Sequence, residues 1–242
     1  MKVFAIGDLH LSGGDNKPMD VFGPHWTGHF ERISADWRQR VSEDDLVLIP
    51  GDISWAMQLD NALPDLREIG RLPGRKVLLR GNHDYWWSAI GRLRAALPEK
   101  MYAIQNDAVS IGGVTVAGSR GWILPGPGTT PEDERIYLRE VSRLRLSLDC
   151  AARLGGQLVV MTHYPPMGEN GQPTEVTRML SEAGAGICVY GHLHGAACRT
   201  AFEGSLGGTA YACVSCDHLG FALYELPLAT PDSGGKNAES GD

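Results

Sequence analysis

Residues 3–10 of this 242-residue chain are VFAIGDLH, an apolar run that ends in a glycine, a carboxylate and an imidazole. Four later apolar runs also end in residues of metal-binding type, at Gly51-Asp52, Gly81-Asn82-His83-Asp84, Thr162-His163 and Gly191-His192-Leu193-His194. Ligands of α/β proteins gather at the carboxyl ends of strands. The five segments are therefore expected to present their polar side chains to one place.

Short apolar runs alternate with segments of helical periodicity, which predicts parallel strands flanked by helices. The predicted strands are residues 3–6, 46–50, 77–79, 158–161 and 187–190. The predicted helices are residues 30–41, 59–71, 88–96, 132–154 and 174–183. A hairpin is expected within residues 101–117, around a turn at 111–114, and consecutive short strands are expected over residues 197–226. Long loops rich in glycine and proline are expected at residues 11–28 and 118–131.

Length and composition indicate one domain over residues 1–226 and a disordered tail over residues 227–242. The formal net charge is -7, and an acidic surface attracts extended nucleic acid poorly. Nucleotides remain compatible with this charge, because bound metal cations would dominate the field near a site.

The cysteines and the apolar runs bear on the cellular compartment. The cysteine count is five, which is odd and argues against a disulfide framework. Cys213 and Cys216 have C-x-x-C spacing without a second pair, so we interpret them as buried free thiols. The sequence shows no signal-peptide pattern and no apolar run near the roughly 20 residues of a membrane helix. These features predict a cytoplasmic protein with no membrane partner.

The polar residues of the five segments form a mixed oxygen and nitrogen donor set. It consists of two carboxylates, one amide and four imidazoles, which are Asp8, Asp52, Asn82, His10, His163, His192 and His194. Such a set suits Mn, Fe, Zn, Co or Ni. Two pairs, Asp8 with His10 and His192 with His194, have a spacing of two, and on extended backbone they would point to one side.

Each segment by itself has an ordinary structural interpretation. Asp8 could form a turn, Gly81-Asn82 is a common turn dipeptide, and His163 could be a partly buried side chain with no ligand. The order of all five segments, and their position after strands, favours a metal centre over five coincidences.

The series Asp-x-His, Gly-Asp, Gly-Asn-His-Asp, His and Gly-His-x-His, over residues 8–194, resembles the calcineurin-like metallophosphoesterase superfamily. Residues 51–57 (GDISWAM) and 83–87 (HDYWW) further resemble an uncharacterised bacterial phosphohydrolase group within it. The resemblance implies a four-layer αββα sandwich with mixed sheets and a centre of two transition-metal ions. It also implies two ligand sets, Asp8, His10, Asp52 and His194 for the first ion and Asp52, Asn82, His163 and His192 for the second. Asp52 would bridge the ions, because a carboxylate has two oxygens and a charge that offsets two cations roughly 3.5–4 Å apart.

By the same resemblance, the protein hydrolyses a phosphomonoester or phosphodiester by attack of a metal-activated water or hydroxide on phosphorus. His83 would be a non-ligand histidine that protonates the leaving oxygen or stabilises the transition state, and Asp84 would orient His83 or form the turn. The expected substrate is a small or nucleotide-like phosphate ester. Arg120 is a candidate phosphate clamp, Trp55 and Trp86 are candidate stacking residues, and Asp217 with His218 could line the same cleft.

Two other functions remain open from the sequence. A nuclease of the same superfamily would use the same ligands, although the chain has no basic run. A non-catalytic scaffold of the same fold would be expected to have lost ligands or the residue equivalent to His83. The sequence keeps all of these residues.

Overall fold

The computed structural model describes residues 1–13 and 19–228. Most of the predicted tail and the centre of the predicted loop at 11–28 lie outside the described residues. The elements that follow are those of the described ranges.

The first sheet has five strands in the order β11-β1-β2-β3-β4. Their bounds are Tyr224–Glu225 for β11, Val3–Ala5 for β1, Leu46–Ile49 for β2, Arg75–Leu78 for β3 and Met101–Ala103 for β4. β1 to β4 run parallel, and β11 pairs antiparallel with β1. β1 and β2 are buried along their whole length, as expected of strands covered on both faces.

The second sheet has six strands in the order β5-β6-β7-β8-β10-β9. Their bounds are Val109–Ile111 for β5, Val114–Ser119 for β6, Gln157–Thr162 for β7, Ile187–Tyr190 for β8, Thr209–Cys213 for β10 and Gly204–Leu206 for β9. The four central strands are parallel, whereas β5 and β9 are antiparallel strands at the two edges. Both sheets are therefore mixed.

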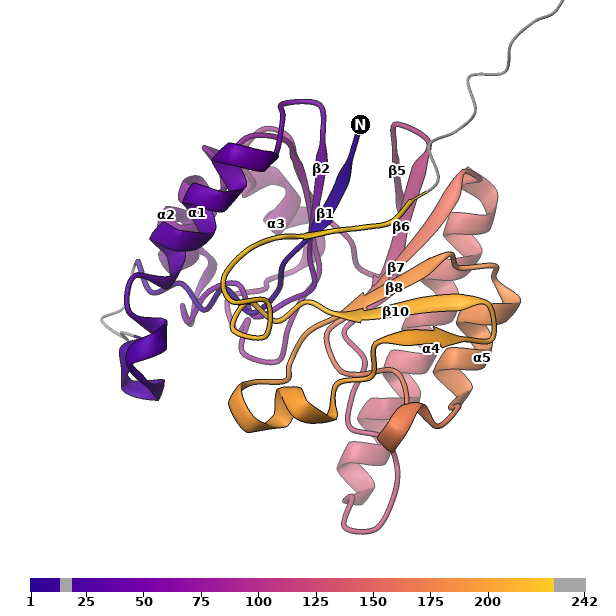
Figure 1. Ribbon diagram of the computed structural model, residues 1–242. Coiled ribbons are helices and arrows are strands. Elements are labelled where there is room, and N and C mark those ends of the chain that lie inside the picture. Colours follow the sequence, from indigo (N-terminus) through magenta and orange to yellow (C-terminus); the bar gives the residue numbers. More distant parts are fainter. Residues whose placement is uncertain (14–18, 229–242) are drawn as a thin grey trace, which may run out of the picture.

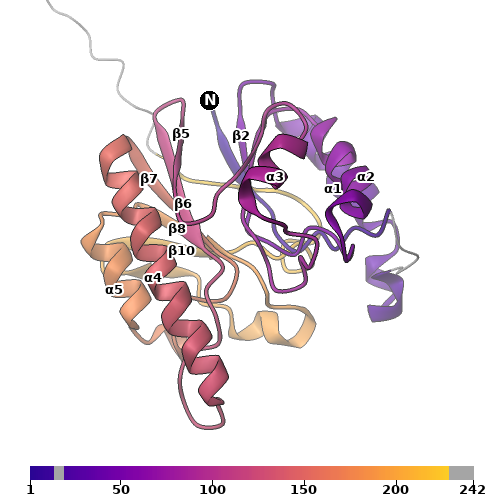
Figure 2. The same cartoon turned by 180° about the vertical axis from the view of Figure 1, so that it is seen from behind.

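The two sheets pack face to face, and helices cover the outer face of each (Figures 1 and 2). The helices are α1 (His29–Arg40), α2 (Leu59–Gly70) and α3 (Ile90–Ala96) on the first sheet, and α4 (Pro131–Leu154) and α5 (Glu175–Glu182) on the second. Three apolar clusters fill the three interfaces. Trp37 of α1 and Ile49 belong to the first cluster, Val77 and Val159 to the cluster between the sheets, and Leu144 of α4 to the third. This is the predicted αββα sandwich.

Local sequence signals explain the longest helix and the predicted hairpin. At the start of α4, the Thr130 hydroxyl accepts a hydrogen bond from the backbone N–H of Asp133, whose carboxylate accepts one from the N–H of Thr130. The predicted hairpin forms between β5 and β6, around Gly112 and Gly113, which both have positive φ.

Two predictions of strand structure need correction. The run at residues 101–103 does not belong to the hairpin, because β4 pairs with β3 in the first sheet. Residues 197–226 hold three short strands in succession, as predicted, but they are not strand throughout. They hold the end of a short 3-10 helix (Gly195–Thr200), β9, β10 and β11, with turns between Cys213 and Tyr224. Within the described residues, no helix is both long and apolar enough to cross a membrane.

Candidate metal centre

The predicted ligands lie at strand ends whose backbone turns sharply. Asp8, His10, Asp52 and His192 all have positive φ, between 46° and 72°. This left-handed conformation is rare and strained for residues with a side chain, and it clusters at functional sites. Asp8 and His10 therefore do not lie on the extended backbone that their spacing suggested. Consecutive tight turns, rather than strand alternation, direct their side chains.

Two glycines beside these turns are required by close packing against the carboxylates. A Cβ on Gly81 would lie 2.1 Å from Oδ1 of Asp52, and a Cβ on Gly191 would lie 2.3 Å from Oδ2 of Asp8. Any other residue at either position would displace a carboxylate. The glycines of the motifs thus allow the backbone of one loop to approach the carboxylate of another.

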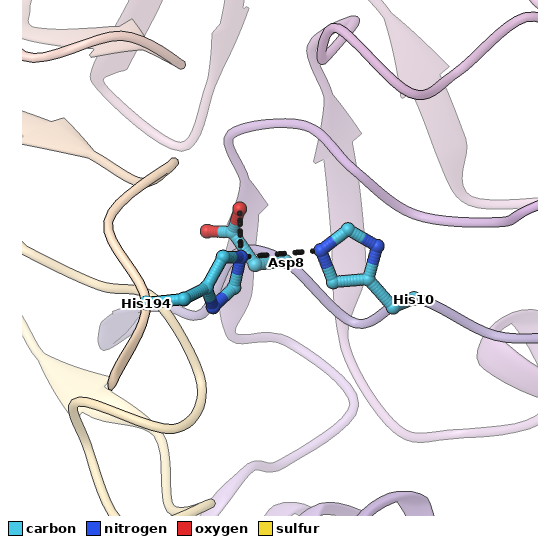
Figure 3. A group of neighbouring side chains, drawn as sticks. All are labelled: Asp8, His10 and His194. Atoms are coloured by element: carbon cyan, nitrogen blue, oxygen red, sulfur yellow. Dashed lines mark hydrogen bonds and ion pairs between the residues drawn. The ribbon is translucent and has the colours of Figure 1, made fainter. Parts of the chain in front are cut away.

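Asp8, His10 and His194 form the first part of the site (Figure 3). Nε2 of His194 lies 3.4 Å from Oδ1 of Asp8 and 3.2 Å from Nε2 of His10. Nε2 of His10 lies 3.7 Å from Oδ2 of Asp52. The Nε2 atoms of His10 and His194 thus face each other beside the carboxylates of Asp8 and Asp52. In this arrangement the two nitrogens could bind the same cation.

Asp52, Asn82, His163 and His192 form the second part. Nε2 of His163 lies 3.5 Å from Oδ2 of Asp52 and 2.7 Å from Oδ1 of Asn82. Nδ1 of His192 lies 3.0 Å from the same Asn82 oxygen. Oδ2 of Asp52 thus lies close to a histidine of each part. All seven predicted ligand side chains meet in one place.

The outer nitrogens of two imidazoles fix which inner nitrogen is free to bind a metal. Nδ1 of His163 donates to the backbone carbonyl of Pro50 at 3.0 Å, which leaves the lone pair of Nε2 facing Asp52. Nδ1 of His194 lies 3.0 Å from a carboxylate oxygen of Asp217, whose other oxygen accepts the backbone N–H of Gly195. Such outer partners hold metal-binding imidazoles in one tautomer and orientation.

The charges of the site are strongly perturbed. Burial, together with the negative charge of Asp8, raises the pKa of Asp52 to about 8. Burial lowers the pKa of His10 to about 3 and that of His192 to about 4. Burial thus keeps His10 and His192 in the neutral state that binds metals, whereas Asp52 holds a proton that a bound metal ion would displace. The residues present therefore fit a transition-metal centre.

A cavity of about 430 Å³ opens beside the first part of the site. Its walls include the rings of His10, His83 and His194 and the apolar side chains of Trp26 and Trp55. The Trp55 ring stacks on His10 with a centroid distance of 4.6 Å, and it lies 4.7 Å from the ring of His83. His83 and Trp55 are thus placed where a substrate bound at the metals would lie. We call this cavity the Trp55 pocket.

Three predicted residues lie away from that pocket. Trp86 is 1% exposed and donates to the Asp84 carboxylate, so it packs in the core and cannot stack on a substrate. Asp84 is fully buried and accepts hydrogen bonds from the backbone N–H groups of Gly81 and Ile53. It joins the loops after β2 and β3, which makes it a positioning residue. Arg120 lines a different cavity and pairs with Glu140.

Some residues around the centre were not identified from the sequence. Asp217 was expected only to line the cleft, yet it is the partner of His194, and its position after β10 was the available signal. Met19, Phe22 and His25 line the Trp55 pocket from short 3-10 helices (Met19–Phe22 and Pro24–Trp26). Nothing in their local sequence indicated this role.

Comparisons with known proteins identify the family of the chain. The sequence profile of the family described as calcineurin-like phosphoesterase matches residues 1–196. The chain therefore belongs to the calcineurin-like phosphoesterases, and it is a metal-dependent phosphoesterase. Among curated proteins, none matches the sequence significantly.

Two solved structures share the fold over nearly the whole chain. The phosphopantetheinyl hydrolase PptH from Mycobacterium tuberculosis is 15% identical, with a TM-score of 0.57 over 97% of this chain and 98% of that chain. The protein of unknown function AQ665 from Aquifex aeolicus is also 15% identical, with a TM-score of 0.50 over 93% of this chain and 95% of that chain.

Proposed function

We propose that this protein hydrolyses phosphate esters at a centre of two transition-metal ions bridged by Asp52. The observation that carries the proposal is the convergence of seven ligand side chains from both sheets, with Oδ2 of Asp52 near His10 and His163. Bound there, two metal ions would supply an activated water and hold the phosphoryl oxygens. The donor set supports Mn, Fe, Zn, Co or Ni.

His83 is the proposed catalytic residue of the chain itself. Its ring lines the Trp55 pocket, 5.9 Å from the ring of His10, so it would face the ester oxygen of a bound substrate. Its backbone N–H donates to Oδ1 of Asp52 at 2.8 Å, which ties its position to the bridging carboxylate. From there His83 would donate a proton to the leaving oxygen or stabilise the transition state.

Two apolar cavities beside the centre favour a phosphodiester over a monoester. The Trp55 pocket borders His10 and His194, and a second cavity of about 330 Å³ borders His192. Tyr164, Met167 and Phe202 line this second cavity. A diester carries two organic groups on phosphorus, so each cavity could hold one of them. A monoester would leave one cavity without an occupant.

A panel of phosphoesters assayed with manganese tests this function. We expect hydrolysis of bis(p-nitrophenyl) phosphate with a higher kcat/KM than that of p-nitrophenyl phosphate, and no hydrolysis by a His163→Ala control. If the protein binds metal and hydrolyses no ester, the proposed function is wrong. A preference for the monoester would contradict only the proposal of a diester.

The two alternative functions, a nuclease and a non-catalytic scaffold, would give different results in these assays. A nuclease would cleave single- or double-stranded oligonucleotides faster than small diesters, although the net charge of -7 does not favour such a substrate. A scaffold would bind no transition metal. The five free cysteines, three of them buried, support a reducing compartment such as the cytoplasm.

A further inference from the structure

A separate cavity of about 280 Å³ lies beside the metal centre, and none of the seven predicted ligands lines it. Its walls include Arg80 after β3, Ser88 before α3 and Arg120 after β6. Glu140 and Arg143 of α4 also line it, together with the uncharged polar residues Gln105, Asn106 and Ser119. We call this the arginine cavity.

The arginine cavity carries an excess of positive charge. Three guanidinium groups face one carboxylate, that of Glu140, which is 2% exposed. Arg143 donates to Glu140 at 2.7 Å, and Arg120 lies 3.5 Å from the same oxygen. Within the described ranges, the side chain of Arg80 has no hydrogen-bond or ion-pair partner. The wall therefore holds more positive charge than its single carboxylate offsets.

Among the residues that the structure describes, three buried donors of the cavity-lining side chains have no partner. They are Nε of Arg80, Nε of Arg120 and Oγ of Ser88. A buried donor without a partner destabilises the folded state, and native proteins seldom leave three together. Burial lowers the pKa of Arg120, and the positive charges of Arg80 and Arg143 lower it further. Like charges and free donors thus lie together around one cavity.

We propose that the arginine cavity binds a phosphoryl oxyanion, either free phosphate or a second phosphoryl group of the substrate. Guanidinium groups bind such anions through paired N–H donors, and the anion would offset the excess charge of the wall.

The cavity is connected to the metal centre through the backbone. Arg80 comes two residues before Asn82, and the carbonyl of Arg120 accepts the N–H groups of His163 and Tyr164, both at 3.0 Å. An anion held by these two arginines would therefore border the loops that carry two metal ligands.

Titration of the metal-loaded full chain with inorganic phosphate tests the proposal. We expect two phosphates per chain in the wild type, one at the metals and one in the cavity, but only one in Arg80→Gln and in Arg120→Gln. Arg139→Gln is the matched control, because Arg139 is exposed on the same helix as Glu140 and has no ion pair within the described residues. Equal stoichiometry in the wild type and both cavity variants would overturn the proposal.

Thermal unfolding separates binding from a purely structural role. Without phosphate, Arg80→Gln should raise Tm, because it removes a positive charge that repels Arg120. With phosphate, the variant should lose most of the Tm increase that the wild type shows. A structural role, or a cavity filled only by water, would give a lower or unchanged Tm in both buffers. Ser88→Ala, a smaller change, should weaken phosphate binding without loss of the fold.

Steady-state kinetics distinguish free phosphate from a second phosphoryl group of the substrate. This assay rests on the proposed esterase function. If the cavity holds a second phosphoryl group of the substrate, Arg80→Gln should raise KM at least about tenfold for a nucleoside 3′,5′-bisphosphate but not for a 5′-monophosphate. If it holds free phosphate, both KM values should stay unchanged. An equal rise for both substrates would place Arg80 at the metal centre and overturn the separate site. Absence of all turnover would count against the esterase function, and the phosphate titration would still test the cavity.

Discussion

At the scale of single residues, the outer contacts of His163 and His194 decide which nitrogen of each ring is free to bind a metal. Pro50 fixes His163 through its carbonyl, and Asp217 fixes His194 through its carboxylate. The hydrogen bonds with Asp217 and Asp8 also raise the pKa of His194 to about 10 despite its burial. In the metal-free protein His194 is therefore protonated at neutral pH, and metal binding must displace that proton.

Replacement of Asp217 by asparagine should weaken metal binding by about 10–100-fold, because the outer partner no longer orients His194 or increases its basicity. Competition with a fluorescent chelator would measure the dissociation constants. Since the pKa of His194 should fall in Asp217→Asn, the metal affinity of the variant should also depend less on pH between 7 and 9. Unchanged affinity and an unchanged pH profile would show that Asp217 plays no such part.

Replacement of His83 by alanine should separate catalysis from metal binding. Because His83 faces the substrate pocket and is not a predicted ligand, we expect kcat to fall by about 10²–10⁴ while two metals per chain remain bound. Metal analysis and kinetics on the same preparation would measure both. Asn82→Ala is the comparison, since it removes a ligand. Equal losses of metal and turnover in His83→Ala would contradict the assignment.

At the scale of elements, each strand ends in a tight turn that places its ligand. The loops after β2 and β3 are joined by the buried carboxylate of Asp84, which accepts N–H groups from both. Gly81 makes this close approach possible, because its hydrogen faces the Asp52 carboxylate. The turns and their contacts thus form one rigid unit.

Replacement of Gly81 by alanine should remove metal binding without unfolding the protein. The new Cβ would lie 2.1 Å from Oδ1 and 2.2 Å from the backbone nitrogen of Asp52, so the bridging carboxylate and its loop must move. We expect loss of at least one metal per chain, measured by elemental analysis, with the helical circular dichroism signal retained. Gly126→Ala is the control, because its Cβ would meet no atom within 4 Å. Full metal content in Gly81→Ala would mean that the turn tolerates a side chain.

The buried Lys76 of β3 predicts how the free energy of unfolding depends on pH. It is 1% exposed, its Nζ donates to the carbonyls of Gly70 and Leu72 at the end of α2, and burial lowers its pKa to about 8. Between pH 8 and 10.5 the folded chain binds fewer protons here than the unfolded chain, so stability rises with pH. The free energy of unfolding of the wild type should rise relative to Lys76→Met by at most about 3 kcal/mol over this window. Denaturant titrations would measure it, and a constant difference would refute the prediction.

At the scale of the whole molecule, the centre joins the two halves of the sandwich. Asp8, Asp52 and Asn82 follow strands of the first sheet, whereas His163 and the two histidines after β8 follow strands of the second. A metal bound by both sets would link the sheets at their carboxyl ends. Metal binding should therefore contribute to global stability as well as to catalysis.

Removal of metal with EDTA should lower Tm, and manganese should restore it. Ligand binding to the folded state alone stabilises by about 4 kcal/mol when the free metal is 1,000 times its dissociation constant. Asp52→Asn, which alters the proposed bridge, should show a much smaller response to manganese. If the wild type binds two metals and keeps the same Tm with and without them, the metals do not stabilise the sandwich.

Elements whose signals are local were predictable from the sequence. The apolar runs that became β1, β2 and β8 and the periodic segments that became α1, α2 and α4 lie within a residue or two of the predicted positions. The burial of Trp86 and the pairing of Arg120 were not predictable, because they depend on which element packs against each side chain in the folded chain. Trp86 lies under the Asp84 turn, and Arg120 meets Glu140 of α4.

The sequence by itself determined three things: the set of donor residues, the order along the chain of the strands that precede them, and the family. Each of these depends on residue type and spacing along the chain. Only the tertiary structure decided which atoms meet, because the contacts join residues far apart, such as His10 and His194, separated by 184 positions. It also decided the left-handed turns at Asp8 and His10, the role of Asp217 and the arginine cavity. Those features arise where loops from different strands pack against each other, and no local pattern encodes that packing.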